Sequence, residues 1–418
     1  MALLQLLHVL VLPTLLSLAF FAATAVMFST RRRRVFLLDY SCFLPEPDQK
    51  CSLEVSEYLV RRSRHFSHRS MEFMRDILLK SGLGNETYAP PFFFLPGLSP
   101  SLYSASLETE GSVLSAAKAV LAKTRISAAR VDVLVVVTGS ACPVPSLSSF
   151  LVHRLGLSPS VRTFNLSSMG CGAGAISLDL AARLLSSTRC IRYSGEDRSM
   201  LVSNCIFRAG AAVALLTNDS STRRSAKLEL LRSLRTHAGA DDAAYSAAYQ
   251  AEDESGNVGI SLKKELVHVA SEGLCDHIRA LAPWVLPWLE LLRCAYWETS
   301  LQERYVPDMT TAFEHLCIHT GGKAVINAVA RVMRLADRDT EPARMCLHRF
   351  GNTSSSLVFY ELAYFEAKGR IRMGDRVWML GFGSGFKACS LVWRSLKDSS
   401  MDDDNPWKGC IHRYPVES

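Results

Sequence analysis

The sequence has no CxxC pair, and none of its histidines and cysteines is spaced like the ligands of a zinc finger. A structural zinc site is therefore not expected, and no metal is predicted. The chain also lacks a basic face interleaved with aromatic residues, so nothing indicates nucleic-acid binding. Its 12 cysteines are scattered, and several lie among apolar residues, as buried reduced thiols do. This pattern suits a reducing compartment that faces the cytosol.

The 418 residues can form two compact domains or one large duplicated domain. With 21% charged and 48% hydrophobic residues, the composition is that of a globular protein. The net charge of +7 is modest, and four of the positive charges lie together at Arg31–Arg34. The remaining basic residues are best explained as a solvated surface.

The clearest regional signal is the uncharged run from Val9 to Phe28. At 1.5 Å per residue, a helix of this length crosses a bilayer core of roughly 30 Å. The four arginines follow the run, whereas a cleaved signal peptide carries its charge before a shorter apolar run. The positive-inside rule then places everything from Arg31 onward in the cytosol. We expect residues 1–30 to be a transmembrane anchor, with a signal peptide as the weaker alternative.

Further along, segments with helical spacing alternate with apolar runs rich in β-branched residues. Residues 131–140 and 209–218 predict buried strands, and residues 106–124 predict an amphipathic helix. In the second half, residues 314–333 predict a loop that runs into a helix. This alternation predicts an α/β architecture, and the similar style of the two halves suggests an internal duplication.

Cys171 lies between glycines in "SMGCGAG", directly before a predicted helix over 174–185. A helix N-terminus favours a thiolate, and small neighbours allow a substrate to approach the sulfur. A structural cysteine in a tight strand-to-helix turn explains this stretch equally well.

Two later stretches favour the chemical interpretation. "EHLCIHTGGK" contains His315 and His319, and "LHRFGNTSSS" contains His348 and Asn352. His319 and Asn352 each precede a predicted helix on a loop flanked by glycine. With Cys171 they could form a Cys/His/Asn site in which two side-chain donors converge on a developing oxyanion.

Eight runs in one consistent order resemble the signature runs of plant 3-ketoacyl-CoA synthases, the membrane-bound condensing enzymes of very-long-chain fatty acid elongation. They are "KSGLGNETYAP", "SMGCGAG", "DRSMLVSNCIFRAGAAVALLTN", "RTHAGADD", "YVPDMTTAFEHLCIHTGG", "CIHTGGK", "HRFGNTSSS" and "GDRVWMLGFGSGFK", and the resemblance covers roughly residues 35–395. It implies a thiolase-like α/β fold of two βαβαβ halves in five αβαβα layers. The N-terminal half, 31–218, would carry the nucleophile, and the C-terminal half, 219–418, the histidine and asparagine.

The resemblance also implies the roles of the site residues. Cys171 would accept the acyl chain of acyl-CoA as a thioester. His319 and Asn352 would hold malonyl-CoA and stabilise the enolate formed as CO₂ leaves, to give 3-oxoacyl-CoA without a cofactor. The further residues implied are His237, His315, His348 and the oxyanion loop Gly383, Ser384 and Gly385. From the residues alone, His315 could equally be a helix-face residue, and His348 could have no role beyond bracing Asn352.

The resemblance further implies an endoplasmic reticulum membrane location with the catalytic region in the cytosol. The implied partners, besides the two CoA substrates and the membrane, are a second copy in a homodimer and the reductases and dehydratase of an elongase complex.

Two features depart from the family pattern. The family usually has two spanning segments, whereas this chain has one. Only eleven residues, Ser186–Glu196, separate Leu185 from Asp197, where the family has a buried strand, a turn and further loop. Because "SSTRCIRYSGE" is polar, we expect one strand of the N-terminal half to be missing.

Three alternatives stay open. The chain could be a catalytically impaired member that serves as a non-enzymatic partner of an elongase complex. It could be a chalcone-synthase-like polyketide synthase, although that class is soluble and the N-terminal run speaks against it. A papain-like cysteine protease would have its cysteine near the mature N-terminus, in a different sequence context.

Overall fold

The structure is a computed structural model that describes residues 34–95, 101–138, 143–167, 169–181, 193–263, 265–300, 305–319 and 321–417. The apolar run from Val9 to Phe28, and with it the predicted anchor, lies outside these residues. In the described part of the chain, no helix combines the length and the apolar composition that crossing a membrane requires.

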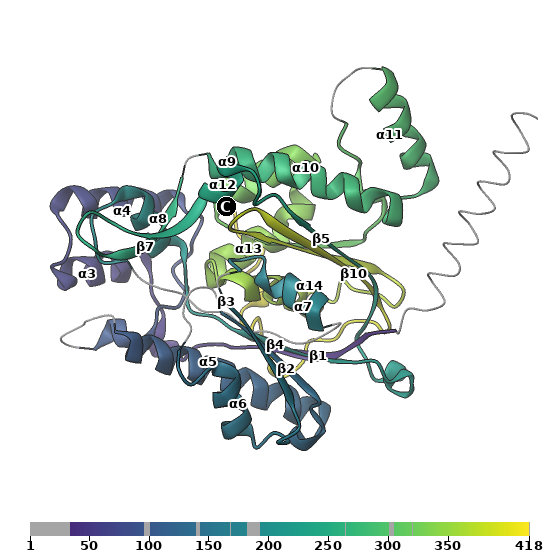
Figure 1. Cartoon of the computed structure of the whole chain (residues 1–418), viewed down its shortest axis with the longest axis horizontal. Coiled ribbons are helices and arrows are strands. Elements are labelled where there is room, and N and C mark those ends of the chain that lie inside the picture. The colour runs from purple at the N-terminus through teal and green to yellow at the C-terminus, as the bar shows by residue number, and fades with distance from the viewer. Residues whose placement is uncertain are drawn as a thin grey trace, which may run out of the picture.

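The main sheet has six strands in the order β4-β1-β5-β10-β9-β8 (Figure 1). All of its neighbours are antiparallel except β8 and β9, which are parallel. The strand bounds are β1 Phe36–Cys42, β4 Ala212–Thr217, β5 Leu228–His237, β8 His315–Ile318, β9 Arg376–Gly383 and β10 Lys387–Ser395. A parallel pair, β2 Val133–Thr138 and β3 Arg162–Ser167, and an antiparallel hairpin, β6 Ala248–Glu252 and β7 Val258–Leu262, form two further sheets.

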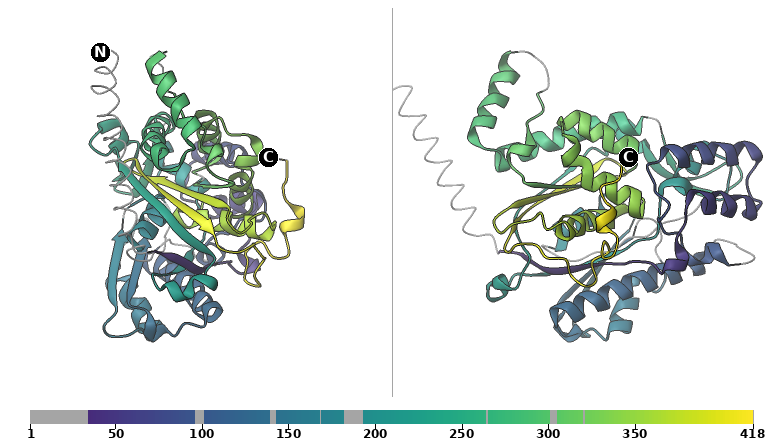
Figure 2. Two further views of the ribbon diagram at one scale, coloured as in Figure 1. Left: turned by 90° about the vertical axis from the view of Figure 1, so that its right-hand side faces the viewer. Right: turned by 180° about the vertical axis from the view of Figure 1, so that it is seen from behind.

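Helices cover both faces of the main sheet (Figure 2). The helix bounds are α3 Leu53–Ser63, α4 His68–Lys80, α5 Leu102–Thr124, α6 Leu147–Leu155, α7 Ala173–Ala181, α8 Arg198–Ile206, α9 Asp242–Ser246, α10 Leu266–Val285, α11 Trp288–Ser300, α12 Lys323–Met333, α13 Asp337–Phe350 and α14 Leu357–Ala367. Alternate residues of β9 face opposite sides. Val377 and Met379 pack with α14, whereas Trp378 and Leu380 pack in the cluster of α10 and α12. A strand that is buried on both faces has a nearly continuous apolar sequence, and the sequence of β9 is of this kind.

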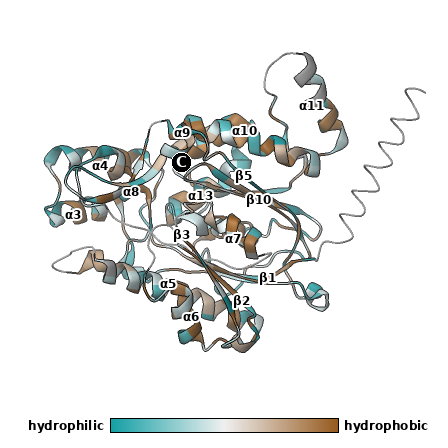
Figure 3. Cartoon of the chain, viewed as in Figure 1, coloured by the Kyte–Doolittle hydropathy of each residue, from teal (hydrophilic) through white to brown (hydrophobic). Residues whose placement is uncertain are grey.

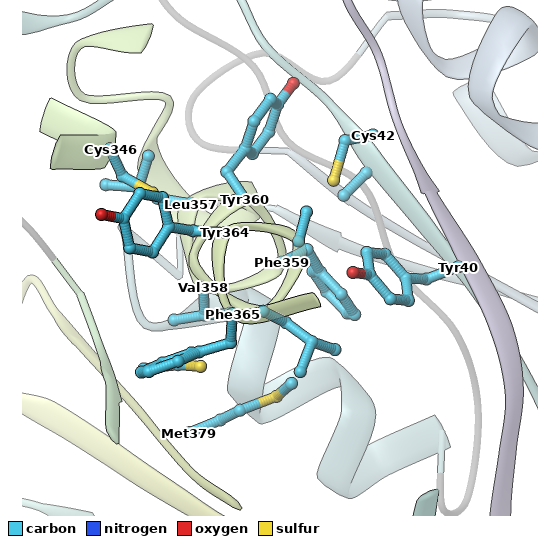
Figure 4. Close-up of a cluster of buried hydrophobic side chains, with 14 of the residues drawn as sticks. Tyr40, Cys42, Cys346, Leu357, Val358, Phe359, Tyr360, Tyr364, Phe365 and Met379 are labelled. Carbon is cyan, nitrogen blue, oxygen red and sulfur yellow. The ribbon is translucent and has the colours of Figure 1, made fainter. Parts of the chain in front are cut away.

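Helix α14 lies at the centre of the core. Its residues from Leu357 to Glu366 are all buried, so it has no solvent face. Figure 4 shows side chains of α14, among them Tyr360, Tyr364 and Phe365, pointing from the helix to different sides. A helix that is apolar all round is a buried one. This matters for the site because the 3₁₀ turn Ser354–Ser356 leads directly into α14 and is fixed by it.

The α/β prediction is confirmed, and most predicted elements form. Residues 131–140 and 209–218 contain β2 and β4, residues 106–124 lie in α5, and the helix predicted from 174 begins as α7. One prediction is wrong. His315–Ile318 was expected to be loop, and His315 a possible helix-face residue, but these residues form β8. They pair with β9, and four residues are too few for a strand periodicity to appear in the sequence.

The strands of the N-terminal half do not form one sheet in the described part of the chain. There, β2 pairs only with β3, and the neighbour of β4 is β1. Val136 of β2 nevertheless packs in one cluster with Ala211, at the entry to β4, and with Val113 of α5. Most of the segment predicted to lack a strand, residues 182–192, lies outside the described residues.

Candidate active site

Cys171 lies in the turn that starts α7. The backbone N–H of Ala173 donates to Gly170 O at 3.1 Å, and that of Ile176 donates to Gly172 O at 3.0 Å. The cysteine therefore precedes the first turn of the helix, as its glycine-rich sequence predicts. Its side chain is partly buried and forms no disulfide.

The glycines around Cys171 are required by close backbone packing. A Cβ atom on Gly174 would lie 2.0 Å from the carbonyl oxygen of Ser355. A Cβ atom on Gly383 would lie 2.7 Å from the backbone nitrogens of Cys171 and Gly172. The first turn of α7 thus touches both the loop before α14 and the tip of the β9–β10 hairpin, main chain against main chain.

Ser354 makes the direct contact with the sulfur. Its hydroxyl donates to Cys171 Sγ at 3.3 Å. Its backbone has a φ of +59°, which is uncommon for a residue other than glycine, and its N–H donates to Asn352 Oδ1 at 2.8 Å. Sequence reasoning missed Ser354. The signal was present in the hydroxyl run "TSSS" directly after Asn352, which was interpreted only as the start of a helix.

Asn352 is buried and links several segments. Its Nδ2 donates to Gly321 O at 3.3 Å, in the loop that follows His319. Its backbone N–H donates to Ile206 O at 3.1 Å, and its carbonyl accepts from the N–H of Arg208 at 3.0 Å. These bonds fix the position of the amide. The NH₂ group has two N–H donors, and the bond to Gly321 uses one of them.

His319 follows β8 directly. Its backbone N–H donates to Leu380 O at 2.9 Å, and its ring is 3% exposed and meets Phe382 edge-on with 5.4 Å between centroids. Burial lowers the pKa of His319 to about 4, so the imidazole is neutral at pH 7. Among the described residues, its Nδ1 has no hydrogen-bond partner. A neutral imidazole in this position can donate or accept a hydrogen bond but brings no positive charge.

Burial also affects the protonation of the Cys171 thiol. Removal from water raises the pKa of the Cys171 thiol, and the hydrogen bond from Ser354 opposes this shift. Because His319 is neutral, it does not counteract the burial. The thiol form is therefore the resting form, and Ser354 is the side chain that favours the thiolate.

The other predicted site residues lie at different distances from this centre. His237 ends β5 beside the loop of Gly383, Ser384 and Gly385, where a Cβ atom on Gly385 would be 3.6 Å from His237 Nε2. The structure therefore brings His237 to the predicted oxyanion loop, which itself packs on Cys171.

His315 and His348 make their described contacts elsewhere. His315 lies at the start of β8, four strand residues or about 13 Å from His319, and its Nε2 pairs with Asp375 Oδ2 at 2.8 Å. His348 is on α13, and its Nδ1 lies 3.3 Å from the hydroxyl of Tyr414. Both contacts support the scaffold around the site.

A cavity of about 1070 Å³ runs along β5 beside α7. It reaches the site through Met169, two residues before Cys171, and through His237. Its charged lining residues are Arg34, Asp179, Glu229, Arg232, Arg235, Lys387 and Arg394, so its walls carry more positive than negative charge.

Comparison with known proteins identifies the class. Residues 27–301 match the family model described as FAE1/type III polyketide synthase-like protein. Residues 310–395 match the model of the C-terminal part of 3-oxoacyl-[acyl-carrier-protein] synthase III. With the mixed α/β fold and the hydrogen bonds that link Cys171 through Ser354 to Asn352 and to the loop after His319, these matches define a thiolase-like condensing enzyme.

Two relatives identify the family within this class. The chain is 41% identical to 3-ketoacyl-CoA synthase 17 of Arabidopsis thaliana, over 94% of this chain and 85% of that protein. It is 42% identical to 3-ketoacyl-CoA synthase 2 of the same plant, over 94% of this chain and 80% of that protein. The chain belongs to the 3-ketoacyl-CoA synthase family. Its assignment to the acyltransferases of fatty acid elongation is confirmed, and the protease alternative is set aside.

Replacement of Ser354 by alanine should slow alkylation of Cys171. Loss of one hydrogen bond to the sulfur costs about 1 kcal/mol, so at a given pH the thiolate population should fall about fivefold. Because burial raises the pKa of Cys171, alkylation should keep rising with pH above the usual titration range of a thiol. Peptide mass spectrometry after timed iodoacetamide treatment measures the rate at Cys171 alone.

The matched control is Ser355→Ala, since Ser355 is the next residue of the same run and its buried hydroxyl has no partner among the described residues. Equal rates for the Ser354 and Ser355 variants would contradict the role of Ser354.

Proposed function

We propose that this chain condenses malonyl-CoA with a long-chain acyl-CoA to give 3-oxoacyl-CoA and CO₂. The observation that carries the proposal is the connection of three segments around one sulfur. Ser354 bonds Cys171, and Asn352 bonds both Ser354 and the loop after His319. The names of the relatives, all 3-ketoacyl-CoA synthases, support the same product class.

In the first half-reaction, Cys171 Sγ attacks the carbonyl carbon of acyl-CoA. A carbon–sulfur bond to Cys171 forms, the bond to CoA breaks, and CoA leaves with the proton that the thiol has lost. Ser354 stabilises the developing thiolate. The backbone N–H groups at Cys171 and in the loop of Gly383, Ser384 and Gly385 are suited to stabilise the tetrahedral oxyanion.

In the second half-reaction, malonyl-CoA loses CO₂ and its thioester becomes an enolate. His319 and the NH₂ group of Asn352 donate hydrogen bonds to the enolate oxygen. A buried neutral imidazole suits this task because it stabilises the anion by a hydrogen bond without first being protonated. The enolate carbon attacks the acyl carbonyl, the bond to Cys171 breaks, and the thiolate takes up a proton. No cofactor takes part.

The remaining histidines have supporting roles in this proposal. His237 positions the loop of Gly383, Ser384 and Gly385, which it adjoins. His315 fixes β8 through Asp375, and His348 fixes α13 through Tyr414. None of the three needs to contact the reacting atoms.

The proposal also covers where the protein acts. Residues 1–30 anchor it in the endoplasmic reticulum membrane, and the arginines after the anchor keep the catalytic region in the cytosol. Residues 31–218 and 219–418 form the two halves of a five-layer thiolase-like fold. The protein acts as a homodimer next to the reductases and dehydratase that complete an elongation cycle.

We further propose that the chain lacks one strand between β2 and β4. Two observations support this. The segment Ser186–Glu196, where the strand is expected, is short and polar. In the described chain β2 and β4 are edge strands of separate sheets, and Val136 of β2 packs in one cluster with Ala211 at the entry to β4. A missing strand leaves backbone N–H and C=O groups of its neighbours without hydrogen-bond partners and weakens the sheet. This observation favours the second candidate function, an impaired member that supports other elongase subunits.

His319→Ala and Asn352→Asp should separate the two half-reactions. Both variants remove a donor to the enolate, and loss of one such donor lowers a rate by about 10²–10³. Asn352→Asp keeps the acceptor for the N–H of Ser354, so the turn should persist. We expect acylation of Cys171 within a few-fold of the unchanged chain, and malonyl-CoA decarboxylation reduced by the stated factor.

The control is His268→Gln, at an exposed position of α10. Release of CO₂ from labelled malonyl-CoA and acyl transfer from labelled acyl-CoA are measured separately. Equal losses in both half-reactions would refute the proposed division of labour.

Insertion of the apolar strand and turn of a longer relative between Leu185 and Asp197 should raise both melting temperature and elongation activity. The physical reason is that the inserted strand would pair with β2 and β4 and close the sheet beneath α7. An insertion of the same length made of glycine and serine is the control. The proposal that a strand is missing would be contradicted if the original chain already melts cooperatively and elongates acyl-CoA as fast as the chain with the inserted strand.

A further inference from the structure

Helix α11 projects from the body of the molecule (Figure 1) and turns an apolar face outward. Trp288, Leu289 and Leu292 are 67%, 58% and 58% exposed, and Tyr296 on the same face is 66% exposed. Figure 3 shows hydrophobic colour along this projecting helix. A contiguous group of large apolar side chains on a surface marks an interaction site, whereas single ones do not.

Glu290 and Leu291 of α11 face the body of the protein. Glu290 is 2% exposed, and its carboxylate accepts hydrogen bonds from the hydroxyl of Tyr305 at 2.6 Å and the N–H of Asp308 at 3.1 Å. It also pairs with Arg293 at 3.2 Å, and Leu291 packs against the core. The helix is therefore held by the buried carboxylate of Glu290 and by Leu291, while Arg293 and the large apolar side chains of the opposite face are exposed. An ordinary surface helix instead buries its apolar stripe.

The apolar face continues onto the end of α10. Trp284 is 58% exposed, and the guanidinium of Arg232 on β5 lies over its ring at 3.8 Å. This contact joins α10, and with it α11, to β5. Strand β5 lies beside the first described residues of the chain. There, Val35 O accepts from the N–H of Leu230 at 2.9 Å, two residues before Arg232.

The same region carries a group of cations. Arg34 lies 3.8 Å from Glu229, and Arg394 of β10 is the register partner of Glu229. Arg232 itself lies on the ring of the exposed Trp284, and all three arginines line the cavity along β5. Aromatic residues beside basic ones are the combination that binds the interface of an anionic membrane.

The chain length before Arg34 limits how far away a membrane can be. Phe28, the last residue of the apolar run, is six residues before Arg34, and six residues reach at most about 20 Å in any conformation. If the run is in a bilayer, the region of Arg34 and Arg232 faces that bilayer closely. With 13 residues, α11 is too short to span it.

We infer that α11 and the end of α10 lie in the interface of the bilayer that holds the N-terminal run, as a second, monotopic membrane contact. The inference rests on the proposed membrane anchor and is independent of the condensing chemistry. Trp288, Leu289 and Leu292 enter the acyl boundary, and the arginines face anionic headgroups. The active site is thereby held at a fixed height and orientation above the membrane in which long acyl chains reside.

The test uses the full chain in vesicles made of phosphatidylcholine with a third of anionic phosphatidylserine, prepared with and without lipids brominated near the top of the acyl chain. Trp378, Trp393 and Trp407 are completely buried, so brominated lipid should quench only tryptophans of α10 and α11. Quenching should fall at least twofold in Leu292→Glu, which puts a charge on the apolar face.

The matched control is Leu79→Glu. Leu79 on α4 is 57% exposed, close to the 58% of Leu292, but α4 lies on the opposite side of the molecule from α11 (Figure 1). This variant should quench like the unchanged chain. Equal quenching in both variants would overturn the placement of α11. A chain that floats with the vesicles but shows no quenching would also overturn it, and would indicate that the apolar face binds a protein partner or a second copy. A chain that does not float overturns the anchor and this placement together, while leaving the condensing activity to be tested separately.

Discussion

The site depends on one packing constraint, the contact of the first turn of α7 with two other segments through main-chain atoms. At Gly174 and Gly383 a single methyl group would overlap the backbone of the neighbouring segment. The cysteine turn, the loop before α14 and the β9–β10 hairpin can therefore approach only in this arrangement. Because α14 is buried on every side, the loop that carries Asn352 and Ser354 has a rigid support. The glycines around Cys171 allow the three segments to pack this closely.

The second constraint is electrostatic, since burial favours the neutral forms of Cys171, His319 and Glu361. Burial lowers the pKa of His319 to about 4 and raises that of the Cys171 thiol. Behind His319, burial also raises the pKa of Glu361 well above its usual range, and Glu361 Oε2 accepts from the N–H of Ile318 at 2.7 Å. An enolate that forms in this site meets hydrogen-bond donors and no fixed negative charge. In the proposed mechanism the negative charge of the malonyl carboxylate moves to the enolate oxygen as CO₂ leaves, and these donors stabilise it at that oxygen.

The sequence predicts the elements of this site better than its contacts. The position of Cys171 before a helix, the buried strands and the family follow from local patterns and ordered motifs. Ser354 and Glu361 were missed because their partners are far away in the chain, 183 residues for the bond to Cys171 and 43 for the bond to Ile318. The strand β8 is too short to show a period, and the orientation of α11 is set by the buried Glu290, which a helical pattern alone would place outside. Short-range spacing identifies a helix, but only tertiary contacts decide which face is covered.

The most direct test of the account is the chemical state of Cys171 during one turnover. The full chain is incubated with a saturated long-chain acyl-CoA, quenched and digested, and the peptide that contains Cys171 is weighed before and after addition of malonyl-CoA. The account predicts an acyl adduct on this peptide that disappears with malonyl-CoA, together with an equal amount of 3-oxoacyl-CoA two carbons longer. An adduct on another cysteine, or elongation by a Cys171→Ala chain, would contradict it.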